Sequence, residues 1–406
     1  MRKIVVPLLV IGLFFVLSAP APAAEKTVED RVKALEDTIG SWSFYGSVRY
    51  ATFYETTSDD AAFKDTGKVT TLATDADMLG RDQKKTLWGL APNTRIGASV
   101  NKGDLGGKYE VGFKDDATLY TRLLYGAYTF DNVTFLVGQD YTPLSPSFSN
   151  QAFKGDTGLK GFGQIDETGS RVPQLKVKWN GLQIALVRTN TSYATALNLP
   201  TEISDNATPP VKTKTNPTTE ILLPHLEVRY SLKMNQATAD IFGGAGSYKV
   251  KCDVLDVNKT VNSYLLGLEG GIKMAPVYAN AVIWMARNSK QLGFNQVDAA
   301  GATFDLTDFS IINDKDYGGA FVAGVAIQKV TVEAGYGLVS SEKDTSGAEN
   351  DKAQSYYLNA TIPVAQTASA KFSVVPEIGV FDYMKDVNGA DQGKVTYAGA
   401  KCQVDF

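Results

Sequence analysis

Histidine and cysteine are the residues that this 406-residue chain has least of. Its one histidine, His225, would have to serve any Ser-His-Asp triad or imidazole metal site alone. Its two cysteines, Cys252 and Cys402, have no metal-binding spacing, so they are either free or joined in a disulfide. These shortages predict a protein that is not an enzyme and holds no metal or cofactor.

Long apolar segments are also missing once the first residues are set aside. Arg2 and Lys3 precede an apolar run over residues 4–17, and Ala21 and Ala23 complete a cleavage signal, which predicts a secretory signal peptide over residues 1–23. Its removal changes the net charge from −4 to about −6, an acidity that argues against a nucleic-acid partner. No later segment offers the roughly twenty consecutive apolar residues of a membrane-spanning helix.

Residues 24–42 show a helical period. Apolar residues recur at alternating spacings of four and three, as at the a and d positions of a coiled coil. This seam consists of Val28, Val32, Leu35, Ile39 and Trp42. Because so short a helix is marginal alone, we expect either a small periplasmic bundle that joins several copies or an amphipathic helix on the protein's own surface.

Beyond this segment the period changes to two. In "FYGSVRYATFYE", Phe44 and Val48 fall on one face of a strand, and Ser47 and Arg49 fall on the other. Sixteen such segments can be distinguished, with the first near Phe44, the second near Pro92 and the last near Gly393. Strands with one apolar and one polar face separate two different environments.

The connections between these segments alternate in length. The short ones are residues 102–106, 131–132, 180–181, 235–236, 275–276, 329 and 365–368. Most of the others are long and polar, and Asn180-Gly181 is typical of a type I′ hairpin. An even strand number, with short turns at one end and long loops at the other, is the pattern of bacterial outer-membrane barrels. Such a sheet must close because lipid cannot satisfy an open edge.

Residues 43–406 are therefore predicted to form a 16-stranded antiparallel transmembrane β-barrel, an all-β fold embedded in outer-membrane lipid. The last strand, which ends on Phe406, is expected to close against the first. This would place Phe406 at the periplasmic rim, where aromatic girdles occur.

Two segments resemble a known family. "TRIGASVNKGDLGGKYEVGF" (residues 94–113) resembles the second hairpin of Gram-negative trimeric porins, and "TRLLYGAYTFDNVTFLVGQDYTPLSP" (residues 121–146) is similar to their following strands. The chain departs from the family at Gln139-Asp140, where Arg-Gln is usual, and at Asp131-Asn132, where a Phe-Gly turn is usual. The N-terminal heptads resemble those of a subset with a periplasmic coiled coil.

This resemblance implies a homotrimer and a constriction loop that follows the fifth strand and folds into the lumen, here residues 143–170. The charged residues of that loop are Lys154, Asp156, Lys160, Asp166 and Glu167. By motif, Arg95 and Arg122 correspond to the basic wall residues that face the loop in the family, and parity adds Arg49. The resemblance also implies that Phe406 is the assembly signal that the barrel-insertion machinery reads.

The function implied is passive diffusion of small hydrophilic solutes and ions. A small excess of basic residues on the lumen parity predicts a weak anion preference. Two alternatives are a barrel sheath around a multihaem electron conduit, which needs a partner in the lumen, and a closed structural or adhesin barrel. A barrel lipase or protease would have to use His225, which shares the lumen parity with Glu227.

Overall fold

The computed structural model describes residues 27–39, 41–57, 83–114, 118–144, 148–156, 158–165, 171–189, 199, 202–204, 212–292, 297 and 301–406. The chain divides into two compact units, residues 1–42 and residues 43–406. The predicted signal peptide, residues 1–23, lies outside the described residues. Among the described residues, no helix has the length and apolar character needed to cross a membrane.

The first unit contains helix α1 (Val28–Ile39). Val28 and Val32 are exposed on it, as seam residues without a partner would be, and Leu35 and Ile39 lie within its bounds. The prediction that Trp42 continues the seam is wrong, because Trp42 is the first residue of β1. From Trp42 onward the two-residue period replaces the helical one, so the backbone is extended. The bundle of several copies stays a prediction.

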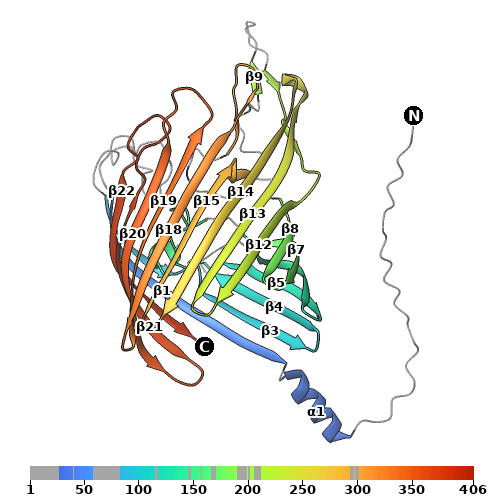
Figure 1. Cartoon of the computed structure of the whole chain (residues 1–406), viewed down its shortest axis with the longest axis vertical. Helices are drawn as coiled ribbons and strands as arrows, with labels where there is room; N and C mark the ends of the chain where they lie inside the picture. Colours follow the sequence, from blue (N-terminus) through green and yellow to red (C-terminus); the bar gives the residue numbers. More distant parts are fainter. Residues whose placement is uncertain are drawn as a thin grey trace, which may run out of the picture. The chain divides into compact units, whose positions relative to one another are not determined.

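The second unit is almost entirely β-structure (Figure 1). It also holds the short helix α2 (Phe153–Asp156) and the 3-10 turns η3 (Asp253–Leu255) and η4 (Ser289–Leu292). The strands are β1 (Trp42–Thr57), β2 (Gln83–Leu90), β3 (Arg95–Lys102), β4 (Leu105–Phe113), β5 (Leu119–Phe130), β6 (Val133–Tyr141), β7 (Arg171–Trp179), β8 (Leu182–Val187), β9 (Glu202–Ser204), β10 (Lys212–Lys214), β11 (Thr218–Glu220), β12 (His225–Met234), β13 (Ala237–Cys252), β14 (Val257–Met274), β15 (Val277–Arg287), β16 (Thr303–Phe304), β17 (Ile311–Ile312), β18 (Asp314–Ile327), β19 (Val330–Lys343), β20 (Asp351–Gln366), β21 (Lys371–Asp382) and β22 (Lys394–Asp405).

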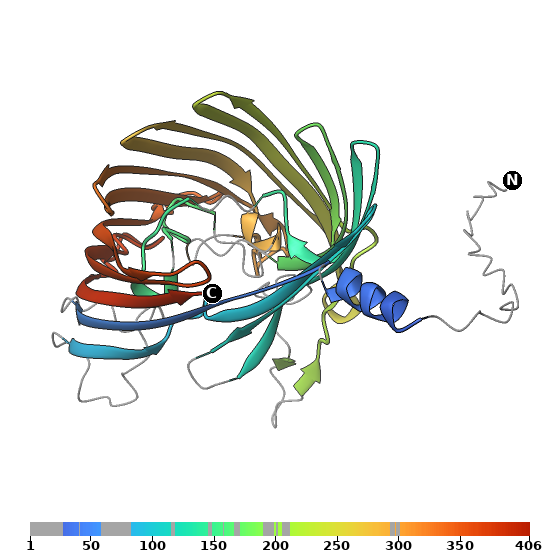
Figure 2. The ribbon, with the colours of Figure 1, turned by 90° about the horizontal axis from the view of Figure 1, so that it is seen from below.

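Apart from two small hairpins, β9–β10 and β16–β17, these strands form one sheet that closes on itself (Figure 2). Antiparallel neighbours follow each other in chain order, and β22 pairs with β1 from Asp405↔Ser47 to Val395↔Thr57. β2 and β3 both pair with β1, and β11 and β12 both pair with β13, so each couple makes one wall strand. The predicted barrel of sixteen antiparallel strands is confirmed.

Proline explains why two wall strands are interrupted. The second wall strand was expected to begin near Pro92, but it begins earlier, as β2 at Gln83, and Pro92 lies in the gap before β3. Pro224 lies likewise in the gap between β11 and β12. Proline has no backbone N–H to donate to a neighbouring strand, so the ladder breaks there.

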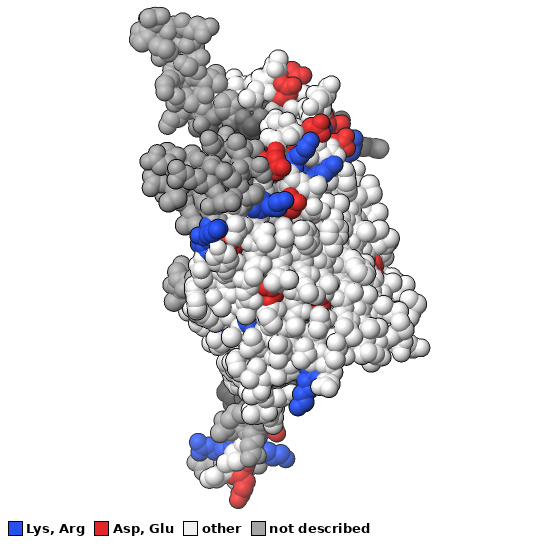
Figure 3. Space-filling model, turned by 90° about the vertical axis from the view of Figure 1, so that its left-hand side faces the viewer, with Lys and Arg blue, Asp and Glu red and all other residues white. Residues whose placement is uncertain are grey.

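The two faces of the wall differ as the alternation predicts. On β1, Ser47, Phe53 and Glu55 are buried inside the barrel, whereas Phe44 and Tyr54 are exposed on its outer surface. The outer surface carries a belt with few charged atoms, and most of the charged atoms in view lie above or below it (Figure 3). An apolar belt between charged ends matches the cross-section of a lipid bilayer.

The predicted alternation of short and long connections is also confirmed. Asn180 and Gly181 have φ values of 45° and 84°, the two positive values that a type I′ turn requires. Three short turns differ by up to two residues from their predicted bounds: they comprise residues 103–104, 328–329 and 367–370. Of the two alternatives for the cysteines, free thiols or a disulfide, the structure shows free thiols. Cys252 is buried and Cys402 is exposed.

Phe406 lies at the seam where the barrel closes. Its N–H donates to the carbonyl of Gly46 at 3.1 Å, and the N–H of Gly46 donates back to Phe406 at 2.7 Å. The ring covers Gly46 so closely that a Cβ added there would lie 2.4 Å from it. The expectation that the last strand closes against the first is confirmed, and glycine at position 46 makes room for the aromatic ring.

Candidate functional site

The connection between β6 and β7 folds into the barrel instead of projecting from its end (Figure 2). We call its described residues, 143–144, 148–156 and 158–165, the inner segment. A carboxylate of the wall holds it in place: Glu377 on β21 accepts the backbone N–H groups of Ala152 at 2.6 Å and Phe153 at 3.0 Å. These two N–H groups begin α2, so Glu377 caps the helix from across the lumen.

A second wall carboxylate holds the part of the inner segment that precedes α2. Glu333 on β19 accepts both the backbone N–H of Asn150 at 2.8 Å and its side-chain amide at 2.7 Å. The hydroxyls of Tyr278 and Tyr357 donate to the same carboxylate, each at 2.5 Å. Because the Glu333 side chain is buried, these four donors replace the water that its charge would otherwise need.

Aromatic rings fix the orientation of α2. Phe153 is fully buried and stacks on Tyr397 with the ring centroids 3.8 Å apart. Phe162 stacks on Phe381 at 4.4 Å, and Trp284 donates its indole N–H to the carbonyl of Gly163 at 2.7 Å. The inner segment is therefore packed against β15 and β19–β22 as tightly as a core element.

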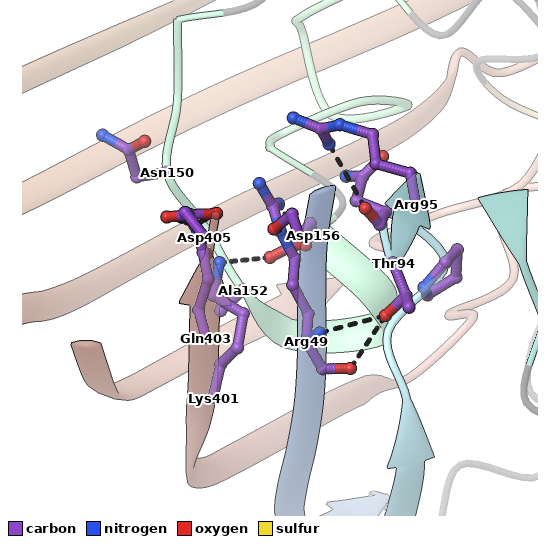
Figure 4. A network of polar contacts seen from close by, with 12 residues as sticks. Arg49, Thr94, Arg95, Asn150, Ala152, Asp156, Lys401, Gln403 and Asp405 are labelled. Atoms are coloured by element: carbon purple, nitrogen blue, oxygen red, sulfur yellow. Dashed lines mark hydrogen bonds and ion pairs between the residues drawn. The ribbon is translucent and has the colours of Figure 1, made fainter. Parts of the chain in front are cut away.

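The other side of α2 faces basic residues (Figure 4). Asp156 ends α2 and forms ion pairs with Arg49 on β1 at 2.7 Å and Lys401 on β22 at 2.5 Å. Thr94 fixes the backbone around Arg49, since its hydroxyl accepts the Arg49 N–H at 3.1 Å and donates to the Arg49 carbonyl at 3.0 Å. All three charged side chains are largely removed from water.

A second ion-pair group lies on the neighbouring strands. Glu110 on β4 lies between Arg122 on β5, at 2.5 Å, and Arg95 on β3, at 3.3 Å. Tyr45 donates its hydroxyl to the same carboxylate at 2.8 Å. Arg122 also donates to the side-chain oxygen of Asn93 at 3.1 Å. One carboxylate thus holds two guanidinium groups, and the group keeps a net positive charge.

These two ion-pair groups border one cavity of about 430 Å³ between the inner segment and the wall. Basic side chains dominate its lining: Arg49, Arg95, Arg122, Lys160, Arg171 and Lys401. Asp156 is the one acidic residue that lines it among the described residues. The field of fixed charges is strongest in a narrow space with low-dielectric walls, so this lining gives the cavity a positive potential.

The structure brings the predicted wall residues Arg49, Arg95 and Arg122 together around this cavity, with Asp156 and Lys160 of the inner segment. Lys154 lies in α2, and Asp166 and Glu167 lie outside the described residues.

Arg171 and Lys401 also line the cavity, although sequence reasoning did not select them as site residues. The strand parity of Lys401 predicts that it faces the lumen. Parity does not predict its position along the barrel axis, so it could not place Lys401 at the cavity. Arg171 follows directly after residue 170, at the end of the predicted loop, and its guanidinium lies over the Tyr141 ring at 5.6 Å.

No protein-family model and no curated protein matches this chain, but solved structures match it over most of its length. The outer-membrane channel DcaP of Acinetobacter baumannii has a TM-score of 0.63 and 16% identity, covering 90% of this chain and 97% of that chain. An anion-selective porin from Comamonas acidovorans has a TM-score of 0.53 and 10% identity, covering 90% and 99%. In vitro folded OmpT of Vibrio cholerae, in its trimer form, has a TM-score of 0.51 and 14% identity, covering 90% and 99%.

At these identities the likeness concerns the fold, which is that of outer-membrane channels. The closed sixteen-stranded barrel and its apolar belt place the protein in the bacterial outer membrane.

Proposed function

We propose that this protein is a porin through which small hydrophilic solutes and ions diffuse passively, with a preference for anions. The lining of the cavity supports this, because the described residues that surround it include six basic side chains and one acidic side chain. The acidic residues Glu333 and Glu377, which also face the lumen, bind the inner segment and do not line the cavity. The preference is therefore expected to exceed what a count of lumen charges predicts.

The position of the inner segment favours a channel over a sheath. A sheath for an electron conduit needs an open lumen for its partner, whereas here Leu144, Phe153 and Leu159 are fully buried inside the barrel. An enzyme is disfavoured by His225, which is buried at the start of β12 and does not line the cavity.

We further propose a homotrimer, with α1 taking part in a periplasmic bundle. The trimer form of the Vibrio cholerae protein, which shares this fold, supports the first point. The apolar side chains of Val28 and Val32, both exposed on α1, support the second.

The experiment that tests the channel is conductance in a planar bilayer, with the reversal potential measured under a KCl gradient. Lys160→Glu replaces a cavity-lining ammonium by a carboxylate and is expected to move the reversal potential toward cation preference. Lys273→Glu is the matched control, because Lys273 is exposed near the short turn of β14 and does not line the cavity. It is expected to behave as the wild type.

Folded protein without any conductance would contradict the channel and favour a closed barrel. Conductance with the same reversal potential in both variants would contradict the role of the cavity. Conductance that changes in units of three would support the homotrimer.

A further inference from the structure

Two acidic side chains lie buried at the long-loop end of the barrel. Asp314 and Asp316 stand at the start of β18 on its inner face, with 0% and 1% of their surface exposed. The basic cavity is lined by other residues. The two carboxyl groups are close enough to interact directly. Because burial removes hydration and like charges repel each other, this pair needs compensation by a cation or a proton.

Neighbouring segments bring hydrogen-bond donors to one oxygen of each carboxylate. Gly301 donates its N–H to Asp314 Oδ2 at 2.5 Å, and Ser289, the first residue of η4, donates its N–H to Asp316 Oδ2 at 3.1 Å. From β19, the hydroxyl of Ser341 donates to Asp314 Oδ2 at 3.4 Å. The strand register pairs Ser341 with Asp316. The connection after β15 and the two wall strands therefore converge on one place.

The other oxygen of each carboxylate remains available. In the described part of the chain, Asp314 Oδ1 and Asp316 Oδ1 are buried without a hydrogen-bond partner. The hydroxyl of Ser289, also buried and without a partner among these residues, lies beside the Asp316 carboxylate. Such atoms are rare in folded proteins, because each loses its hydration without replacement. Three oxygen atoms from two segments are thus directed at a ligand of positive charge.

Two lysines nearby do not bond these oxygen atoms. Lys343, which is in register with Asp314, donates its ammonium group to the carbonyl of Gly301, and Lys290 belongs to η4. Among the ion pairs of the described residues, none joins either lysine to the two carboxylates. Both ammonium groups act on Asp314 and its neighbour only from a distance. The place for a directly bound cation is therefore still open.

We propose that Asp314, Asp316 and Ser289 bind a calcium ion at the outer end of the barrel. Calcium suits this set because it takes carboxylate and other oxygen ligands and completes its coordination with water. The long-loop end of a barrel faces the outside of the cell, where calcium-binding modules have dissociation constants of about 10⁻⁴ to 10⁻³ M. The ion would join η4 to β18 and so fasten the connection between β15 and β18 to the wall. This site is independent of conduction, so a barrel that fails to conduct can still bind calcium.

The test is isothermal titration calorimetry with CaCl₂ near neutral pH, on the full detergent-purified protein freed of lipopolysaccharide. We expect one calcium ion per chain. Asp316→Asn keeps the size of the side chain and is expected to weaken binding about tenfold or more, because affinity depends on the number of charged ligands. Asp344→Asn is the matched control, since Asp344 is an exposed carboxylate at the same end of the barrel, 3.8 Å from Lys315. A wild type that binds no calcium, or equal binding in the two variants, would overturn the proposal.

A milder substitution covers the case in which Asp316→Asn does not fold. Ser289→Ala removes the hydroxyl and keeps the N–H that Asp316 accepts. It is expected to bind calcium more weakly than the wild type but more tightly than Asp316→Asn. Unchanged binding in Ser289→Ala would overturn the assignment of this hydroxyl as a ligand.

Hydrogen exchange tests the position of the ion without any substitution. The amides of Ser289 and Gly301 donate to the two carboxylates. At a calcium concentration of about ten times the dissociation constant, their exchange through local opening should slow about tenfold. The amide of Ala390, which donates to Asp386 in another long connection, is the control and should not change. Calcium binding that leaves Ser289 and Gly301 unprotected would overturn this site.

Discussion

The two walls that flank the inner segment use charge in opposite ways. On β19 and β21, Glu333 and Glu377 accept N–H and O–H groups, and their charges are consumed in holding the inner segment. On β1, β3 and β5, the arginines also form ion pairs, but there they outnumber the carboxylates and line the cavity. The comparison teaches that a charge facing the lumen is not necessarily a charge facing the solute.

The largest expected effect is on the basic wall. Arg122→Ala leaves Glu110 buried with Arg95 and Tyr45 as its remaining partners. We expect the free energy of unfolding to fall by about 3 kcal/mol, because removing one partner of a buried ion pair leaves the other charge with less compensation than its burial requires. Urea unfolding in lipid vesicles, followed by tryptophan fluorescence, measures this. Glu110→Gln/Arg122→Ala removes the charge as well and should recover most of the loss, so equal loss in both variants would contradict the explanation.

A somewhat smaller effect is expected on the acidic wall. Glu377→Ala removes the acceptor of two N–H groups at the start of α2, which is expected to cost about 2 kcal/mol of unfolding free energy. The inner segment should then move more freely, and single-channel conductance should become larger and noisier. Glu342→Ala, on the same sheet but exposed, is the control. Unchanged conductance in Glu377→Ala would show that the remaining contacts suffice.

Asp156→Asn sharpens the comparison by removing the one acidic group that lines the cavity in the described part of the chain. Arg49 and Lys401 then lose their carboxylate partner, and the anion-to-cation permeability ratio is expected to rise about threefold, from a charge change at a few ångströms in a watery pore. The reversal potential under a KCl gradient measures it. A decrease in this ratio would contradict the assignment of the cavity as the path of the ions.

Asp156 also predicts a pH dependence. Burial acts to raise its pKa, but Lys401 and Arg49 act to lower it, and the net pKa lies below the ordinary value of 3.8. Its ion pairs therefore contribute stability above that value and lose it only as the pH falls through the lower folded-state pKa. Asp156 should stay ionised between pH 7 and pH 5, because this range lies about one unit or more above the ordinary pKa of 3.8. The ion preference of the wild type should therefore not change through Asp156 in this range. A protonation of this residue above pH 5 would contradict the pairing.

The smallest effect on stability is expected at the seam. Phe406→Ala uncovers Gly46 and is expected to cost about 1 kcal/mol, the scale of one cross-strand aromatic contact. If Phe406 is also the assembly signal, the yield of membrane-inserted barrel should fall far more than this value implies, whereas Phe406→Tyr should retain it. A normal yield of Phe406→Ala would contradict the signal.

The barrel could be predicted from the sequence because its physical signals are local. Alternation has a period of two residues, and turns such as Asn180-Gly181 require positive φ within two residues. Errors occur where a local pattern has two meanings. Trp42 fits both the helical seam and the first strand, and Pro92 resembled a strand start although it interrupts a strand that has already begun.

The site could be predicted only in part because it depends on contacts distant in sequence. Lys401 and Asp156 are 245 residues apart, and Phe153 and Glu377 are 224 apart. Parity places Lys401 and Glu377 on the inner face but gives no height along the barrel, and it says nothing of Asp156 and Phe153, which lie in α2. For the same reason, a count of lumen charges sets every carboxylate of the inner face against the basic residues. Glu333 and Glu377 do not act in this way, because they bind the inner segment.

The inner segment also has a mechanical consequence. Its ends continue into β6 and β7, while its middle is bonded to β15, β19 and β21 on the far side of the lumen. It therefore acts as a strut across the barrel, and lateral pressure from the bilayer that would flatten the wall must first break these buried bonds. The opening beside α2 should keep its size while the surrounding membrane changes its tension.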